Sequence, residues 1–160
     1  MKNKYFITRT FAIIFFISIA NTVYGQDSVW TVYNTSNSGL PHNNVHGIAI
    51  DGNGNKWILT LGGGLAKYDG TNWNAMGLGI RQWANANCIL ASSNGSVYAG
   101  GYFTNIGGIN SKAVARWDGT NWTAMGEGLF FAPKVNGYVN TLTQTTNGDI
   151  VVGGYFTNAS

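Results

Sequence analysis

The chain has 160 residues, of which 44% are hydrophobic and only 9% are charged, and it contains 23 glycines and 6 tryptophans. This composition excludes a disordered chain, which combines low hydrophobicity with high charge, and it is not typical of long helices. The formal net charge of +3 arises from Lys2, Lys4 and Arg9, because the basic and acidic residues of 26–160 balance. A neutral surface attracts phosphate backbones weakly, so we expect no nucleic-acid partner.

The N-terminal segment has the three parts of a secretory signal peptide. Three positive charges precede an apolar run at residues 11–20, and residues 21–25 end in the small residue Gly25. This run is too short to cross about 30 Å of hydrocarbon as a helix, which argues against the alternative, a membrane anchor. We predict a signal peptide at residues 1–25, no membrane span in the visible chain, and export to the cell surface, the extracellular space or the periplasm.

Sequence blocks recur along the rest of the chain. Residues 69–77 (Asp-Gly-Thr-Asn-Trp-Asn-Ala-Met-Gly) return 49 residues later, at 118–126, with one substitution. Residues 94–105 return 53 residues later, at 147–158. Residues 53–60 match the start of the same block and precede it by 41 residues. Each period contains four short strand-like runs separated by Asx-Gly turn signals. Four strands in every 40 to 50 residues, roughly, are typical of a β-propeller blade; a stacked β-helix is the alternative.

The expected strands have the same order in each period. The first period has 45–50, 56–60, 65–68 and 72–76; the second has 86–91, 97–100, 113–117 and 121–125; the third begins with 139–143 and 150–153. We therefore predict an all-β fold for residues 26–160, a β-propeller with about two and a half four-stranded antiparallel blades of an incomplete ring. Its parts are blade 1 at 45–76, blade 2 at 86–125, a partial blade 3 at 139–160 and a closing strand at 28–33.

The closing strand is predicted because Trp30 occupies the repeat position of Trp73 and Trp122. Propellers usually have four to eight blades, and the visible periods supply fewer. We therefore expect the remaining blades to come from a missing C-terminal part.

Three segments of the first period carry recognisable motifs, at residues 37–45, 54–60 and 63–69. They resemble the two-component-regulator propeller repeat, which typically has a Gly-Leu-Pro-x-Asn-x-Val start and a Gly-Asn-x-Trp-Ile-Gly-Thr core. Leu59 stands where that family usually has Gly. The later copies resemble a related Gly-Gly-x-Phe-Thr … Ala-Arg-Trp-Asp-Gly repeat of kelch-like propellers in bacterial surface proteins. The resemblance implies a bacterial β-propeller, a scaffold that hosts sensors, binding modules and enzymes alike.

Antiparallel order predicts that the tight Asx-Gly turns share one end of the sheets and that the longer connections share the other. Binding residues usually lie in longer loops on a rigid scaffold. The ligand-binding candidates are residues of the longer connections that break the repeat: His42, Arg81, Trp83, Phe130 and Lys134. Tyr102 and Phe103 recur as Tyr155 and Phe156, so we predict that they are packing residues.

Enzyme chemistry receives little support from the visible residues. Glycoside hydrolysis needs two carboxyl groups about 5 to 10 Å apart, but of the carboxylates in the repeats only Glu127 maps to the long-connection end. His42 and His46 are spaced i, i+4, which brings two metal ligands together only on a helix, and this stretch is predicted to be loop and strand. The pair therefore does not indicate a metal site. Cys88, the single cysteine, excludes an intrachain disulfide and occupies a small-residue position, which predicts a buried, inert thiol. We expect no metal, no cofactor and no catalytic site in the visible part.

The main functional hypothesis is an exported β-propeller that acts as a binding or interaction module for an unknown ligand, a glycan or a protein. One alternative is the periplasmic ligand-sensing propeller of a two-component regulatory system. The other alternative is a fragment of an exported carbohydrate-active enzyme, whose acid and base would lie in the missing blades.

Overall fold

The computed structural model describes residues 30–61, 64–76, 85–131 and 135–159. These residues form fifteen strands joined by turns, and none of them is in a helix. The predicted all-β fold is therefore confirmed, whereas the predicted signal peptide lies outside the described residues. In this part of the chain, nothing has the length and apolar character of a membrane-crossing helix.

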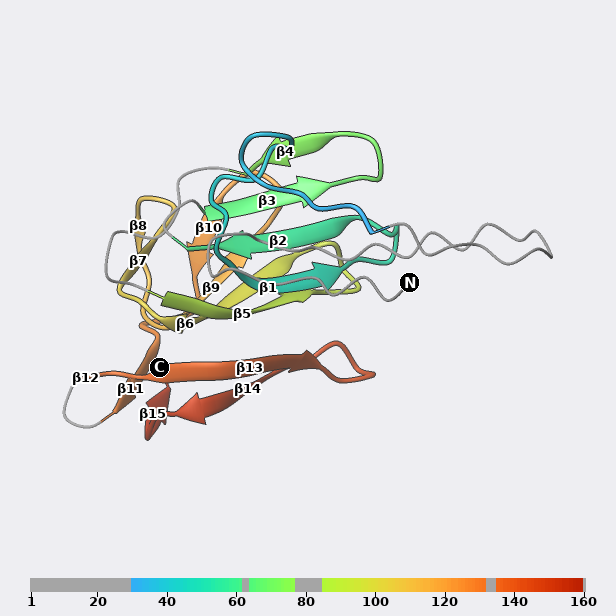
Figure 1. The fold of residues 1–160 in the computed structure, drawn as a ribbon. Helices are drawn as coiled ribbons and strands as arrows, with labels where there is room; N and C mark the ends of the chain where they lie inside the picture. Colours follow the sequence, from blue (N-terminus) through green and yellow to red (C-terminus); the bar gives the residue numbers. More distant parts are fainter. Residues whose placement is uncertain (1–29, 62–63, 77–84, 132–134, 160) are drawn as a thin grey trace, which may run out of the picture.

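The first sheet has four antiparallel strands in the order β1-β2-β3-β4 (Figure 1). They are β1 (Val45–Ile50), β2 (Lys56–Thr60), β3 (Gly64–Tyr68) and β4 (Trp73–Ala75). Each Asx-Gly turn in this sheet uses a glycine with positive φ, which a residue with a Cβ adopts only with strain. Gly54 has a φ of 80° and Gly70 a φ of 104°.

The second sheet repeats this arrangement. Its strands are β5 (Asn85–Ala91), β6 (Val97–Tyr102), β9 (Val114–Trp117) and β10 (Trp122–Ala124), in the order β10-β9-β6-β5. A third, two-stranded sheet pairs β13 (Tyr138–Gln144) with β14 (Ile150–Tyr155). All ten strands predicted within the three periods are present, and their ends differ from the predicted ones by at most two residues.

Five further strands were not predicted. A two-stranded hairpin, β7 (Asn105–Ile106) with β8 (Ile109–Asn110), interrupts the second period. A three-stranded sheet has the order β12-β11-β15, and its strands are β11 (Leu129–Phe131), β12 (Val135–Asn136) and β15 (Asn158–Ala159). Strands of two or three residues are too short to produce the alternating pattern by which strands are recognised in a sequence.

The first strands of the three repeated sheets lie next to one another. Contacts join β1 to β5 and β5 to β13. The ring nitrogen Nδ1 of His46 lies 2.9 Å from the carbonyl oxygen of Ala86, and the backbone N–H of Ser93 donates to Oε1 of Gln144 at 2.9 Å. The described sheets do not close into a ring, and the number of blades stays a prediction.

Apolar side chains fill the space between successive sheets. The largest cluster joins the first two sheets and buries Trp57, Trp117 and Trp122 together with Phe103. A second cluster, with Val114, Leu129 and Val139, joins the second sheet to the third. Three repeat tryptophans thus have a packing role between the sheets, and Trp73 is half-buried.

The predicted closing strand lies partly outside the described residues. Residues 30–33, the part that the structure describes, are not in a strand, and Trp30 is exposed whereas its repeat counterpart Trp122 is buried. Tyr33 instead packs on the first sheet, with its ring centroid 5.7 Å from that of Tyr68 and 5.3 Å from that of Trp73. The role in ring closure stays a prediction.

Candidate binding site at the long-connection end

The two ends of the sheets differ in the length of their connections (Figure 1). The turn end carries the short connections β1–β2, β3–β4, β5–β6, β9–β10 and β13–β14. The long-connection end carries the β7–β8 hairpin and the segment between β10 and β11.

Carboxylates at the turn end are used to shape the turns. The backbone N–H groups of Thr71 and Asn72 donate to Asp69 at 2.8 and 2.7 Å, and the corresponding groups of the next repeat donate to Asp118, both at 2.8 Å. These backbone hydrogen bonds lower the pKa of both carboxyl groups, because they favour the charged form.

Asp51 is the most extensively bonded of these carboxylates. Burial raises its pKa, but hydrogen bonds from Asn55, Trp57 and Asn53 outweigh this effect and lower the pKa overall. The indole N–H of Trp57 donates to its Oδ2 at 2.9 Å. Asp51 therefore connects a turn to the core, and its oxygens are already occupied by donors of the protein.

The β7–β8 hairpin packs at the long-connection end against the second sheet. Ile106 is buried in the large cluster, and Gly107, with a φ of 59°, lies against the indole of Trp122. A Cβ at this glycine would lie 2.2 Å from Cδ1 of Trp122, so no larger residue fits without displacing the hairpin. The hairpin is thus a fixed part of this end, and it leads directly into Ser111 and Lys112.

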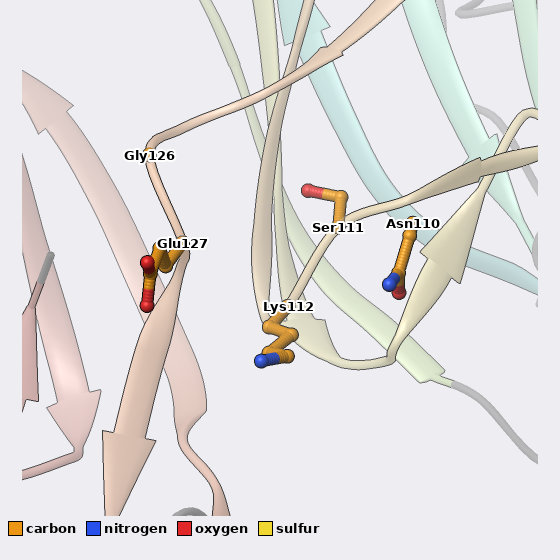
Figure 2. A pocket seen from close by; sticks show the side chains of 5 residues that line it. All are labelled: Asn110, Ser111, Lys112, Gly126 and Glu127. Carbon is orange, nitrogen blue, oxygen red and sulfur yellow. The ribbon is translucent and has the colours of Figure 1, made fainter.

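A hollow of about 260 Å³ opens between two connections at this end. One connection runs from β8 to β9 and the other from β10 to β11 (Figure 2). The lining residues are Asn110, Ser111, Lys112, Gly126 and Glu127. Most of them are polar, so the hollow offers hydrogen-bonding groups rather than an apolar surface.

Close backbone approach holds the two connections together. The N–H of Leu129 donates to the carbonyl of Lys112 at 3.3 Å. Gly128 has a φ of 98°, and a Cβ there would lie 2.6 Å from both Cβ and the carbonyl oxygen of Lys112. A glycine is therefore required where the second connection crosses the first.

Lys112 is positioned by an aromatic ring and by the backbone that follows it. Its Nζ lies 4.3 Å from the ring centroid of Phe130, within the range of a cation–π interaction. Ala113 comes next; it is fully buried and has a φ of 65°, which is unusual for a residue with a side chain. Its N–H donates to the carbonyl of Phe103, and its own carbonyl accepts from Gly101, each at 2.9 Å.

The remaining side chains that line the hollow have two roles: one stabilises the connection, and the others are exposed and available to a ligand. The hydroxyl of buried Ser111 donates to the carbonyl of Val114 at 2.7 Å, so it stabilises the connection. Asn110 and Glu127 are exposed, and Figure 2 shows Lys112 between them. One cation, one carboxylate and one amide therefore face the same hollow, a set that suits a polar ligand with both donors and acceptors.

Two stacked tyrosines lie at the same end of the sheets. The ring centroids of Tyr102, at the end of β6, and Tyr138, at the start of β13, are 5.3 Å apart with an interplanar angle of 18°. Phe103 is 1% exposed, which confirms its predicted packing role. Tyr102 packs on Tyr138 but is 39% exposed, so part of its ring faces solvent.

The sequence-predicted candidates have different positions. Phe130 lies against Lys112 beside the hollow. His42 is exposed in the connection that precedes β1; its Nδ1 accepts the N–H of Asn44 at 2.9 Å, and it does not line the hollow. Arg81, Trp83 and Lys134 lie outside the described residues.

Sequence reasoning missed Lys112, Asn110 and Tyr138 as candidates. The longer connections were identified, but only the crossing at Gly128 brings Lys112 next to Glu127 and Phe130, and no spacing in the sequence signals that crossing. The available signal was weak: one connection carries a cation, and the neighbouring one carries a carboxylate and an aromatic residue.

Other reactive groups belong to the packing of the sheets. Cys88 is half-buried, and burial raises the pKa of its thiol to about 11, which agrees with an inert thiol. Across residues 30–61, 64–76, 85–131 and 135–159, no three His, Cys, Asp or Glu side chains gather in a group that could hold a metal ion.

No protein-family model and no curated protein sequence matches the chain. A solved structure that is similar to it is the extracellular domain of a protein described as a hybrid two-component system, from B. thetaiotaomicron. The sequence identity is 23% and the TM-score is 0.48. The match covers 79% of this chain and only 16% of that chain.

Proposed function

We propose that the chain is part of an exported β-propeller that binds a polar ligand at the long-connection end, and that its visible part is non-catalytic. The observation that carries this proposal is the hollow between the β8–β9 and β10–β11 connections, where Lys112 and Glu127 lie on two backbones that pack closely at Gly128. Binding groups held by a rigid scaffold lose little entropy when a ligand binds.

The arrangement of the sheets supports the propeller. Successive antiparallel sheets contact each other through their first strands, β1, β5 and β13. The apolar clusters lie between the faces of neighbouring sheets. Both features are what radial blades around a common axis require.

The chemistry of the long-connection end favours a carbohydrate as the ligand. Charged and amide groups such as Lys112, Glu127 and Asn110 form directed hydrogen bonds to hydroxyl groups. The stacked rings of Tyr102 and Tyr138 add an exposed aromatic surface on which the apolar face of a sugar can pack. A protein ligand is the second possibility, since tyrosines are also enriched at protein interfaces.

The turn end supports a binding role over a hydrolytic one. Asp51, Asp69 and Asp118 each accept hydrogen bonds from their own turns, so these carboxylates are committed to structure. Glu127 is the carboxylate that faces the hollow among its lining residues. A binding contact needs only this one group, whereas general acid–base hydrolysis of a glycoside needs two.

The test is a glycan-array screen of the exported chain, followed by titration of the bound sugars. Glu127→Gln preserves the shape of the side chain and removes its charge, and loss of a charge-assisted hydrogen bond weakens binding by about 10-fold or more. Asp149→Asn is the matched control, because it removes one exposed carboxylate at the turn end. Absence of any retained sugar, or equal weakening by both variants, would contradict the proposal.

A further inference from the structure

Tyr102 and Tyr138 form a stacked pair that joins two different sheets. Tyr102 is the last residue of β6 in the second sheet, and Tyr138 is the first residue of β13 in the third sheet. Their ring centroids are 5.3 Å apart, and the angle between the ring planes is 18°. The contact lies between two sheets that this chain contains, so it needs no further sheet before or after them.

Backbone hydrogen bonds tie both tyrosines to neighbouring segments. The main chain on both sides of Tyr102 is bonded to Ala113, through an N–H donor of the preceding residue and a carbonyl acceptor of the following one, each at 2.9 Å. The N–H of the residue before Tyr138 donates to the carbonyl of Leu129 at 2.8 Å. These bonds restrict the backbone at each ring and so favour a constant distance between the two rings.

Both rings are accessible to a reagent in solution. Tyr102 is 39% exposed and Tyr138 is 36% exposed. Within the described part of the chain, neither phenol hydroxyl has a hydrogen-bond partner, so each can release its proton to water. A second tyrosine pair, Tyr33 with Tyr68, differs because both rings are half-buried and the hydroxyl of Tyr68 donates to the carbonyl of Gly70 at 2.7 Å.

We infer that Tyr102 and Tyr138 are a site of oxidative cross-linking, where a haem peroxidase with hydrogen peroxide joins the two rings as dityrosine and so links the second sheet to the third. Each phenol loses one electron and one proton to give a tyrosyl radical. A carbon–carbon bond then forms between an ortho carbon of each ring, and the hydrogen on each of these carbons moves to the phenolic oxygen. Hydrogen peroxide takes up the two electrons and two protons and becomes two molecules of water.

Tyr155 is the competing partner for Tyr138. It lies opposite Tyr138 in the register of β13 and β14, and it is 62% exposed. A link between these two residues would join strands that are already paired, whereas a link from Tyr138 to Tyr102 joins two sheets. The stacked geometry selects Tyr102, because two short-lived radicals couple most readily when their rings are already in contact.

The test treats the exported chain with hydrogen peroxide and a haem peroxidase at low protein concentration, and the monomer is then isolated by size exclusion. We expect dityrosine fluorescence in the monomer. Peptide mapping should give one linked pair of peptides, with residues 102 and 138 at the link and a mass two hydrogen atoms below the sum of the two peptides. The linked monomer should also unfold at a higher urea concentration than the untreated chain, because the link closes a loop in the unfolded state.

Conservative variants identify the residues that react. Tyr102→Phe and Tyr138→Phe keep the stacked ring and remove the oxidisable hydroxyl, so after the same treatment each should lack both the linked peptides and the gain in urea resistance. Tyr155→Phe is the matched control, and it should give the wild-type amount of product.

Four results would overturn the inference: no dityrosine in the wild-type monomer, a link between Tyr138 and Tyr155 instead, product that persists in Tyr102→Phe, or equal urea resistance with and without the link. None of these measurements requires a bound ligand, so the proposed function is tested separately.

Discussion

The turn end and the long-connection end of the sheets differ in how far repeat-equivalent residues share the same surroundings. At the turn end, Asp69 and Asp118 occupy equivalent places and accept equivalent backbone hydrogen bonds. At the long-connection end, equivalent residues have different surroundings, as Tyr102 stacks on Tyr138 while Tyr155 lies at the edge of the last repeated sheet. Repetition therefore identifies the residues that build the scaffold, and departures from repetition identify the end of the sheets that carries the proposed binding site.

The sharpest test of this comparison uses two adjacent aromatic residues at the long-connection end. Phe103→Ala should lower the free energy of unfolding by about 3–5 kcal/mol, because it empties a fully buried site in the largest cluster. Tyr102→Ala should lower it by only about 0.5–1.5 kcal/mol, since mainly one aromatic pair is lost. Denaturant unfolding followed by tryptophan fluorescence measures both. Equal losses would mean that the two residues share one structural role.

A smaller effect is expected at the turn end. Asp51→Ala removes the acceptor of the Trp57 indole, which is buried, and this should lower the free energy of unfolding by about 1–3 kcal/mol. Asp69→Ala is the matched control, because that carboxylate accepts hydrogen bonds from its own turn and contacts no buried donor. The same unfolding experiment measures both variants. A larger loss for Asp69→Ala would contradict the assigned role of Asp51.

The smallest effect concerns acid pH. The pKa of Asp51 is lowered in the folded chain, so its contribution to stability is complete above the ordinary value of 3.8 and is lost as the pH falls through the lowered native value. The difference in unfolding free energy between the wild type and Asp51→Ala should therefore be constant near neutral pH and shrink in strong acid. Urea titrations over this range measure the difference, and one that grew on acidification would show that the sign is wrong.

The sequence predicted the scaffold well because the scaffold depends on local signals. The Asx-Gly turns before Trp73 and Trp122 indicate hairpins, and the repeat predicts the same strand order in every period. The β7–β8 hairpin was missed because each of its strands has only two residues. The position of Gly107 against Trp122 depends on packing between segments.

The candidate site was predicted only in part, for a similar reason. Phe130 was found as a residue that breaks the repeat, but Lys112 is brought to it by a crossing of two backbones at Gly128. Tyr102 and Phe103 are adjacent and recur together, so the repeat could not show that one is buried and the other exposed. Residue spacing does not show which side chains meet or which are buried, because both depend on contacts that form only in the folded chain.

The left-handed backbone at Ala113 has a consequence for how this end can change. A glycine there would adopt the same torsion with less strain, yet it would remove a methyl group that packs in the core and would loosen the turn that presents the neighbouring ammonium group. Relief of backbone strain and loss of a buried methyl group therefore act in opposite directions on the stability of this connection, and alanine keeps the methyl group at the expense of a strained backbone.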